Sequence, residues 1–246
     1  LQFPSNFDPA KKYPALVSVY GGTPSNGLNE NFVNANPLAE YGFLVVKLDA
    51  RTNLGRGRKV LDTTYKQLGI AEIDDMAAGI RSLWSRPYFD RERVGMYGTS
   101  YGGTVSAAMV LRHPDTVQAA SASSPVTDYR LYDTVYSERH LGLPQTDADA
   151  HDRAALLPLA GQLRGDLMLY YGTSDDNVHP KNTLQLIQAL QAAGKSFEVQ
   201  VGPDKGHTGL DQRRMMEFFI ERLILDRPAQ PGRSPAASFG PNADPG

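Results

Sequence analysis

The 246-residue sequence contains no cysteine. Disulfides, thiolate metal sites and cysteine nucleophiles are therefore excluded. The sequence also lacks a large excess of charge of either sign, because it has 25 basic and 27 acidic residues and a formal net charge of −2. This near-neutrality argues against nucleic acid or an anionic membrane as the main partner. No run of about eighteen apolar residues is present, so no part of this segment is expected to span a membrane.

The composition is that of a globular protein. Hydrophobic residues make up 41% of the chain and charged residues 21%, which excludes a disordered or fibrous class. The chain starts at Leu1 and no signal-like segment follows. We therefore expect it to be cut from a longer protein.

Short runs of β-branched and other apolar residues alternate with helical patterns. The apolar runs predict buried parallel strands at Pro14–Tyr20, Phe43–Ala50, Val94–Gly98, Val117–Ser123, Asp166–Gly172 and Phe197–Val201. Steps of three and four residues predict helices that carry Ile70, Ile73, Ala77, Ile80 and Trp84, then Leu184, Ile187 and Leu190, then Met215, Phe219 and Leu223. This alternation predicts an α/β fold, with a mostly parallel sheet and helices on both faces.

The last twenty residues differ from the rest. Residues 227–246 contain five Pro, three Gly and a single large apolar residue, Phe239. Such a segment buries too little surface to offset its ordering entropy, which predicts a flexible tail. We therefore expect one α/β domain over residues 1–226.

The strongest local signal is the segment Gly98–Gly103, GTSYGG, which fits the pattern G-x-S-x-G. A predicted strand precedes it, and a predicted helix over Gly103–His113 follows. A serine on such a sharp turn has a strained backbone, which is tolerated only if its neighbours lack bulky side chains. Ser100 is therefore predicted to be a nucleophile, and the alternative is a helix-capping serine in an ordinary glycine-rich turn.

A serine nucleophile needs a base and an acid that orients the base. In this type of fold the chain order is Ser, acid, His. Asp175 and Asp176 follow the predicted strand Asp166–Gly172, and we favour Asp175 because the spacing D-x-x-V then includes Val178. Asp176 is expected to cap the helix that starts near Pro180.

The base is predicted to be His207, on the glycine-flanked loop before the last helix. It is the histidine that both follows the acid and lies on a different loop; the others are His113, His140, His151 and His179. Two donors are needed for the oxyanion. They are expected to be the backbone N–H of Tyr101 and the hydroxyl of Tyr20, which stands in the turn after the first strand; the alternative for Tyr20 is a strand-end aromatic.

These residues resemble the catalytic domain of the prolyl oligopeptidase family, in particular its dipeptidyl peptidase IV branch. The similarity is densest in KKYPALVSVYGG, GTSYGG, SPVTDYRLYDTVYSERHLGLP, GTSDDNVH and KGHTGL. The resemblance implies an α/β-hydrolase fold and Tyr20 as the side-chain oxyanion donor. It implies that Asn177 binds a substrate carbonyl, and that a small apolar pocket for proline or alanine at P1 is lined by Tyr101, Val126, Tyr129, Tyr132, Tyr136 and Val178.

The resemblance also implies an amino-terminal β-propeller in the full-length protein, which would supply acidic residues for the substrate's α-amino group, and it leaves a homodimer open. The early strands of the hydrolase fold are expected to be missing too. Two positions depart from the branch, which usually has tryptophan where Thr99 stands and tyrosine where His140 stands. We therefore expect a relative within the family, of dipeptidyl or tripeptidyl aminopeptidase type.

The predicted function is cleavage of short peptides after proline or alanine through an acyl-enzyme on Ser100, with His207 as base and Asp175 as acid. No cofactor or metal ion is required, and the partner is a peptide substrate. The alternatives are a carboxylesterase for small esters, since the same groups cleave both bonds, and a non-catalytic binding domain.

Overall fold

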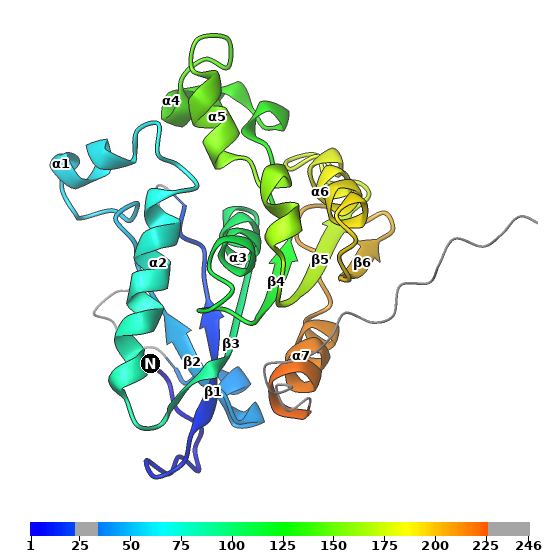
Figure 1. Ribbon diagram of the computed structural model, residues 1–246. Coiled ribbons are helices and arrows are strands. Elements are labelled where there is room, and N and C mark those ends of the chain that lie inside the picture. The colour runs from blue at the N-terminus through cyan, green and yellow to red at the C-terminus, as the bar shows by residue number, and fades with distance from the viewer. Residues whose placement is uncertain (23–33, 226–246) are drawn as a thin grey trace, which may run out of the picture.

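The computed structural model describes residues 1–22 and 34–225, shown in Figure 1. The predicted tail at 227–246, and with it the domain boundary at 226, lies outside the described residues. Within the described ranges, the six strands are β1 (Tyr13–Ser18), β2 (Leu44–Lys47), β3 (Phe89–Thr99), β4 (Ala119–Ser123), β5 (Asp166–Gly172) and β6 (Glu198–Gly202).

The strands form one sheet in the order β2-β1-β3-β4-β5-β6, and every neighbouring pair is parallel. An isolated antiparallel bridge joins Gln2 to Val45 of β2. All six predicted strands are present, and the predicted mostly parallel sheet is confirmed.

Helices cover both faces of the sheet, so successive residues of a strand enter different cores. On β1, Ala15 and Val17 belong to a large apolar cluster that also holds residues of α2 (Ala71–Arg81), α3 (Tyr101–Arg112) and α6 (Lys181–Ala192). Leu16, between them, packs in a second cluster with residues of α7 (Gln212–Ile220) and of the π-helical turn η6 (Glu221–Leu225). Successive side chains of a strand point to opposite faces of the sheet, so the cluster that each one joins shows which face a helix covers.

The segment between β4 and β5 holds the helices drawn at the top of Figure 1, α4 (Thr134–Leu141) and α5 (Ala148–Ala154). The remaining elements are short: α1 (Arg58–Leu61) and the 3₁₀ turns η1 (Pro37–Tyr41), η2 (Asp62–Thr64), η3 (Ser82–Ser85), η4 (Tyr129–Leu131) and η5 (Leu157–Gln162).

Several strand and helix ends differ from the predicted ones by one to three residues, and two further differences have a clear structural reason. β3 begins at Phe89 rather than Val94, because Phe89 pairs with Tyr13 ahead of a register shift in β1. The periodic segment that ends at Trp84 is α-helical only to Arg81 and continues as the 3₁₀ turn η3.

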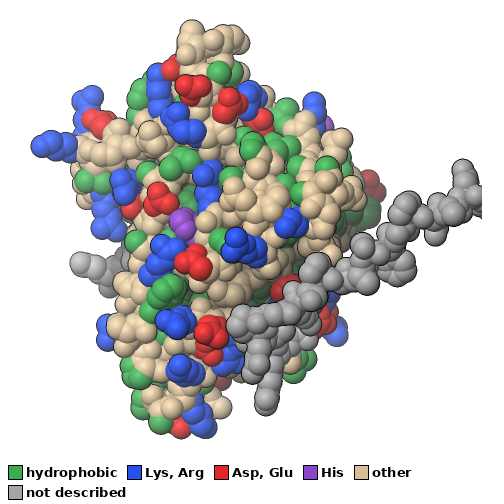
Figure 2. Space-filling view, in the orientation of Figure 1, with side chains coloured by type: hydrophobic (Ala, Val, Ile, Leu, Met, Phe, Trp, Pro, Cys, Tyr) green, Lys and Arg blue, Asp and Glu red, His purple; other side chains and the backbone are tan. Residues whose placement is uncertain are grey.

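The surface agrees with the near-neutral charge. Figure 2 shows Lys and Arg side chains interspersed with Asp and Glu over the visible face. No helix in the described ranges combines the length and hydropathy that a bilayer crossing requires.

Helix α6 offers a matched test of the packing, because Leu186 is fully buried and Leu184, two residues earlier, is 47% exposed. Leu186→Ala is expected to lower the free energy of unfolding by about 2–5 kcal/mol through lost burial and a residual cavity. Leu184→Ala should change it by about 0.5 kcal/mol or less. Denaturant titration of both variants measures the difference, and equal losses would contradict the assigned helix face.

Candidate active site

Ser100 lies at the turn between β3 and α3, with a strained backbone at φ 63° and ψ −123°. Its N–H donates to Ser123 O at 2.9 Å, and its carbonyl accepts from Thr104 N–H at 3.0 Å. A non-glycine residue holds such a conformation only where its surroundings fix it, and strain of this kind clusters at active sites. The turn places the side chain at the first turn of α3, where negative charge is favoured.

Two glycines leave room for this turn. A methyl group on Gly98 would lie 2.4 Å from the carbonyl oxygen of Val19, and one on Gly102 would lie 2.3 Å from the same oxygen. The end of β1 therefore packs directly against the serine turn, and any side chain at either glycine would separate the two. This agrees with the sequence prediction that the neighbours of the strained serine must lack bulky side chains.

Asp175 and His207 are joined by a hydrogen bond of 2.9 Å between Oδ2 and Nδ1. Asp175 follows β5, and its side chain is completely buried. Its Oδ1 accepts from the N–H groups of Asn177 and Val178 at 3.0 and 2.9 Å. Three donors thus hold the carboxylate, and it in turn fixes the imidazole with Nδ1 as the protonated nitrogen.

The turn after β4 connects Ser100 with His207. Ser123 O accepts the Ser100 N–H, and Ser124 Oγ donates to His207 O at 3.0 Å. Ser124 itself has a positive φ of 45°. Asp175 and His207 are in direct contact. Ser100 is connected to His207 indirectly, through the hydrogen bonds of Ser123 and Ser124. Among the described residues, the buried His207 Nε2 has no hydrogen-bond partner.

Asp176 does not have the capping role that the sequence analysis gives it. Pro180 occupies the N-cap of α6, and no side-chain cap bond is made there. Instead, His179 Nδ1 accepts from Lys181 N–H at 3.2 Å. Asp176 is exposed beside the buried Asp175.

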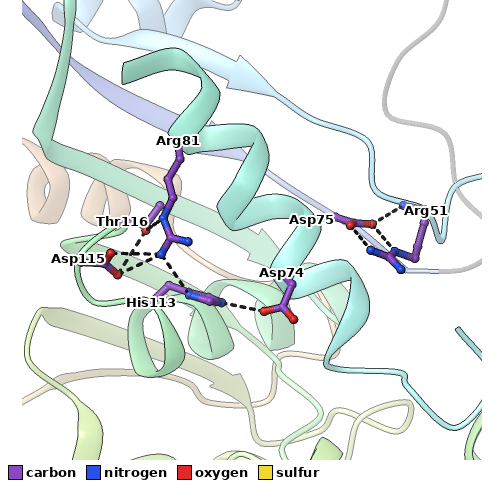
Figure 3. Close-up of polar contacts among 7 residues, drawn as sticks. All are labelled: Arg51, Asp74, Asp75, Arg81, His113, Asp115 and Thr116. Atoms are coloured by element: carbon purple, nitrogen blue, oxygen red, sulfur yellow. Dashed lines mark hydrogen bonds and ion pairs between the residues drawn. The ribbon is translucent and has the colours of Figure 1, made fainter. Parts of the chain in front are cut away.

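The three remaining histidines have other contacts. His113 lies between Asp74 Oδ1, 3.2 Å from its Nε2, and Arg81, as Figure 3 shows. His151 Nε2 lies 3.0 Å from Gly142 O. The ring of His140 packs on Tyr136 with centroids 4.3 Å apart, and its Nδ1 lies 2.8 Å from Tyr136 O.

Tyr20 stands after β1 with half of its side chain exposed. Its ring centroid lies 6.3 Å from that of Tyr101, the residue after Ser100. Thr52 Oγ1 donates to Gly21 O at 2.7 Å, which fixes the backbone that follows Tyr20. The candidate oxyanion donors therefore lie on adjoining segments.

The predicted pocket residues are gathered in one cluster. Four of them are buried and two are half-buried against the same apolar core; they are Tyr101, Val126, Tyr129 and Val178, and Tyr132 and Tyr136. The ring of Tyr136 meets Tyr132 at 5.9 Å and Tyr101 at 6.3 Å between centroids. The Tyr132 hydroxyl donates to Asn177 Oδ1 at 3.1 Å, which leaves the Asn177 amide to act as a donor.

A cavity of about 580 Å³ adjoins this cluster at Tyr136. Its other lining residues are Leu54, Leu61, Asp62, Thr64, Tyr65, Asp133, Val135, Arg139 and His140. Across the described ranges, no group of three or more His, Asp or Glu side chains is arranged to hold a metal ion.

Sequence reasoning missed Glu72, which is fully buried although it is acidic. Its Oε1 accepts from the Tyr101 hydroxyl and from Gly69 N–H. The signal was present, because residues 72, 76 and 80 share one helix face and the other two are the buried Met76 and Ile80.

The parallel sheet, the strained serine between β3 and α3, and the acid and histidine after β5 and β6 define the class of α/β-hydrolases. Residues 30–223 match the model of the prolyl oligopeptidase family. The chain belongs to this family of serine peptidases.

Several relatives are dipeptidyl peptidases. The chain is 34% identical over 210 residues to the probable dipeptidyl-aminopeptidase B of Arthroderma otae, an alignment that covers 83% of this chain and 23% of the relative. It is 34% identical over 214 residues to human dipeptidyl peptidase 8, covering 83% and 24%. The crystal structure of Porphyromonas gingivalis dipeptidyl peptidase 4 superposes with a TM-score of 0.85 at 34% identity, covering 90% of this chain and 33% of that one. The chain thus spans about a quarter to a third of these relatives, and the resemblance to the dipeptidyl peptidase branch is confirmed.

The close approach of Val19 to the serine turn can be tested at Gly98. Gly98→Ala is expected to lower the free energy of unfolding by about 1–3 kcal/mol, because the added methyl group overlaps the Val19 carbonyl. Gly161→Ala is the control, since among the described residues no atom outside its immediate chain neighbours lies within 4 Å of the added methyl group there. Thermal unfolding of both variants measures the effect. A Gly98→Ala protein as stable as the control would mean that β1 and the serine turn are not in contact.

Proposed function

We propose that this chain is the catalytic domain of a serine peptidase that cleaves short peptides after proline or alanine. The observation that carries the proposal is the Asp175–His207 hydrogen bond, on the same edge of the sheet as the strained Ser100. Membership of the prolyl oligopeptidase family, and relatives named as dipeptidyl peptidases, support the peptidase assignment. Release of dipeptides or tripeptides from an amino terminus is part of the proposal.

The reaction begins with attack of Ser100 Oγ on the carbonyl carbon of the scissile peptide bond. His207 Nε2 takes the hydroxyl proton, and its Nδ1–H donates to Asp175, which stabilises the imidazolium that forms. A hydrogen bond between Ser100 and His207 is not required beforehand, because catalytic hydrogen bonds often tighten only when substrate is bound. Collapse of the tetrahedral intermediate breaks the C–N bond, and His207 returns the proton to the leaving amine. Water then hydrolyses the acyl-enzyme by the same route.

The oxyanion is held by the Tyr101 N–H and the Tyr20 hydroxyl. Both would act in a partly enclosed site, where fixed donors stabilise charge better than water does. The P1 residue lies against Tyr132, Tyr136 and their four buried neighbours. Flat aromatic walls suit proline, since its rigid apolar ring needs no polar partner. The Asn177 amide donates to a substrate carbonyl.

Ser100→Ala tests the nucleophile. Turnover of an Xaa-Pro p-nitroanilide is expected to fall by about four to six orders of magnitude, since no covalent intermediate can form. The fold should be retained, as checked by circular dichroism. Parallel assays with p-nitrophenyl acetate separate the two candidates, because a peptidase cleaves the anilide as well as the ester, whereas a carboxylesterase cleaves the ester alone. Unchanged turnover in the variant would remove Ser100 from the mechanism.

Asp175 and Asp176 form a matched pair for testing the acid. Asp175→Ala is expected to reduce kcat by about three to four orders of magnitude, because His207 loses the group that sets its tautomer and balances its charge. Asp176→Ala should leave kcat within about twofold of the wild type, since its side chain is exposed. Steady-state kinetics of both variants on the same substrate measure the two kcat values. Comparable losses of kcat in both variants would contradict the assignment of Asp175.

A further inference from the structure

Tyr101 takes part in three features of the proposed site. Its N–H is the proposed oxyanion donor, and its ring contacts Tyr136 in the proposed P1 pocket. The same ring also packs closely against the backbone of Gly22. A methyl group on Gly22 would lie 2.8 Å from Tyr101 Cγ. The position of the Tyr101 ring therefore affects the pocket wall and the loop that carries Tyr20 together.

The hydroxyl group of Tyr101 donates a hydrogen bond to the carboxylate of Glu72. Glu72 lies in the first turn of α2 with no exposed surface, and its Oε1 accepts from the Tyr101 hydroxyl. The same oxygen accepts from Gly69 N–H at 2.6 Å, where Gly69 has a φ of +78°. Glu72 Oε2 is buried and has no hydrogen-bond partner among the described residues.

Both donors to Glu72 in the described part of the chain are neutral, and a buried carboxyl group with such partners is costly for folding, so a role beyond packing accounts for it better than stability alone. Burial raises the pKa of Glu72. Burial, and next the nearby Glu72, also raise the pKa of Tyr101 well above its ordinary range, so the phenol remains a donor at neutral pH.

We propose that Glu72 is a positioning residue for catalysis: by accepting the Tyr101 hydroxyl, it fixes the ring that supports both the Tyr20 loop and the P1 pocket. This inference rests on the proposed function, because it assigns Glu72 a role in that same site. Removing the acceptor should mainly lower kcat, since the loop and the Tyr101 N–H act on the oxyanion that forms in the transition state.

The kinetic test uses the Ser100-dependent hydrolysis of p-nitrophenyl acetate, whose small acyl group does not require the P1 pocket. Glu72→Leu is expected to lower kcat about tenfold with KM changed less than threefold. Glu72→Gln, which keeps an oxygen acceptor, should restore kcat to within about threefold of the wild type. Tyr101→Phe should lose about as much as Glu72→Leu. The double variant should lose no more than either single one, because both remove the same contact.

The control is Arg81→Leu, which acts at the other end of the same two helices. Arg81, at the end of α2, bonds to Thr116 and Asp115 just beyond α3, as Figure 3 shows. This variant should lower the melting temperature and leave kcat and KM of the folded enzyme unchanged. Wild-type kcat in Glu72→Leu, or an equal loss in Arg81→Leu, would overturn the positioning role.

Crystal structures of the wild type and Glu72→Leu give a second measurement that does not depend on catalysis. The Tyr101 ring and the Gly22 backbone should move in the variant. An unmoved ring would overturn the inference. By contrast, the proposed function would be contradicted if the wild type hydrolysed p-nitrophenyl acetate no faster than the Ser100→Ala variant. In that case the two crystal structures would still show whether Glu72 positions the Tyr101 ring.

Discussion

The approach of the Val19 carbonyl to the turn around Ser100 is the contact on which the rest of the site depends. The oxygen lies where any side chain at Gly98 or Gly102 would stand. The end of β1 can therefore press against the β3–α3 junction, and the backbone of Ser100 is held at positive φ by its surroundings. Because Tyr20 follows Val19 directly, the same contact places the Tyr20 ring near Tyr101, the residue after the serine, with centroids 6.3 Å apart. Two glycines thus link the strained backbone to a candidate oxyanion donor.

The proposed catalytic groups come from the carboxyl ends of parallel strands, where an open α/β sheet places its sites. β1 contributes Tyr20, β3 contributes Ser100, β5 contributes Asp175, and His207 follows β6. β4 contributes no proposed catalytic group, yet its end joins the others, since Ser123 binds the Ser100 N–H and Ser124 binds the His207 carbonyl. One central strand end thereby fixes the spacing between nucleophile and base. Glu72 adds a similar support from the helix layer, because it holds Tyr101 from the side of α2.

Most of the fold could be predicted because buried parallel strands form continuous apolar runs, as in Leu44–Lys47 and Asp166–Gly172. The start of β3 was missed, since its charged residues Asp90–Arg93 do not resemble a buried strand and lie between the pairings of Phe89 and Val94, where the register shifts. The Asp175–His207 contact could be predicted because chain order and strand ends constrain it. The roles of Glu72 and Ser124 could not, because each depends on a partner far away in sequence, and a buried acid or a strained serine is unfavourable by local rules. The expected cap at Asp176 failed because Pro180 and His179 occupy that helix start.

The central claim is that Ser100 is a nucleophile activated by the His207–Asp175 pair. The most direct measurement is covalent labelling with a fluorophosphonate, followed by mass spectrometry of the digested chain, because this reagent reacts with an activated serine whatever the substrate specificity. The account predicts one adduct per chain, located on Ser100, and slow labelling when His207 is replaced by glutamine. Labelling at another serine, or no labelling of the folded chain, would contradict it.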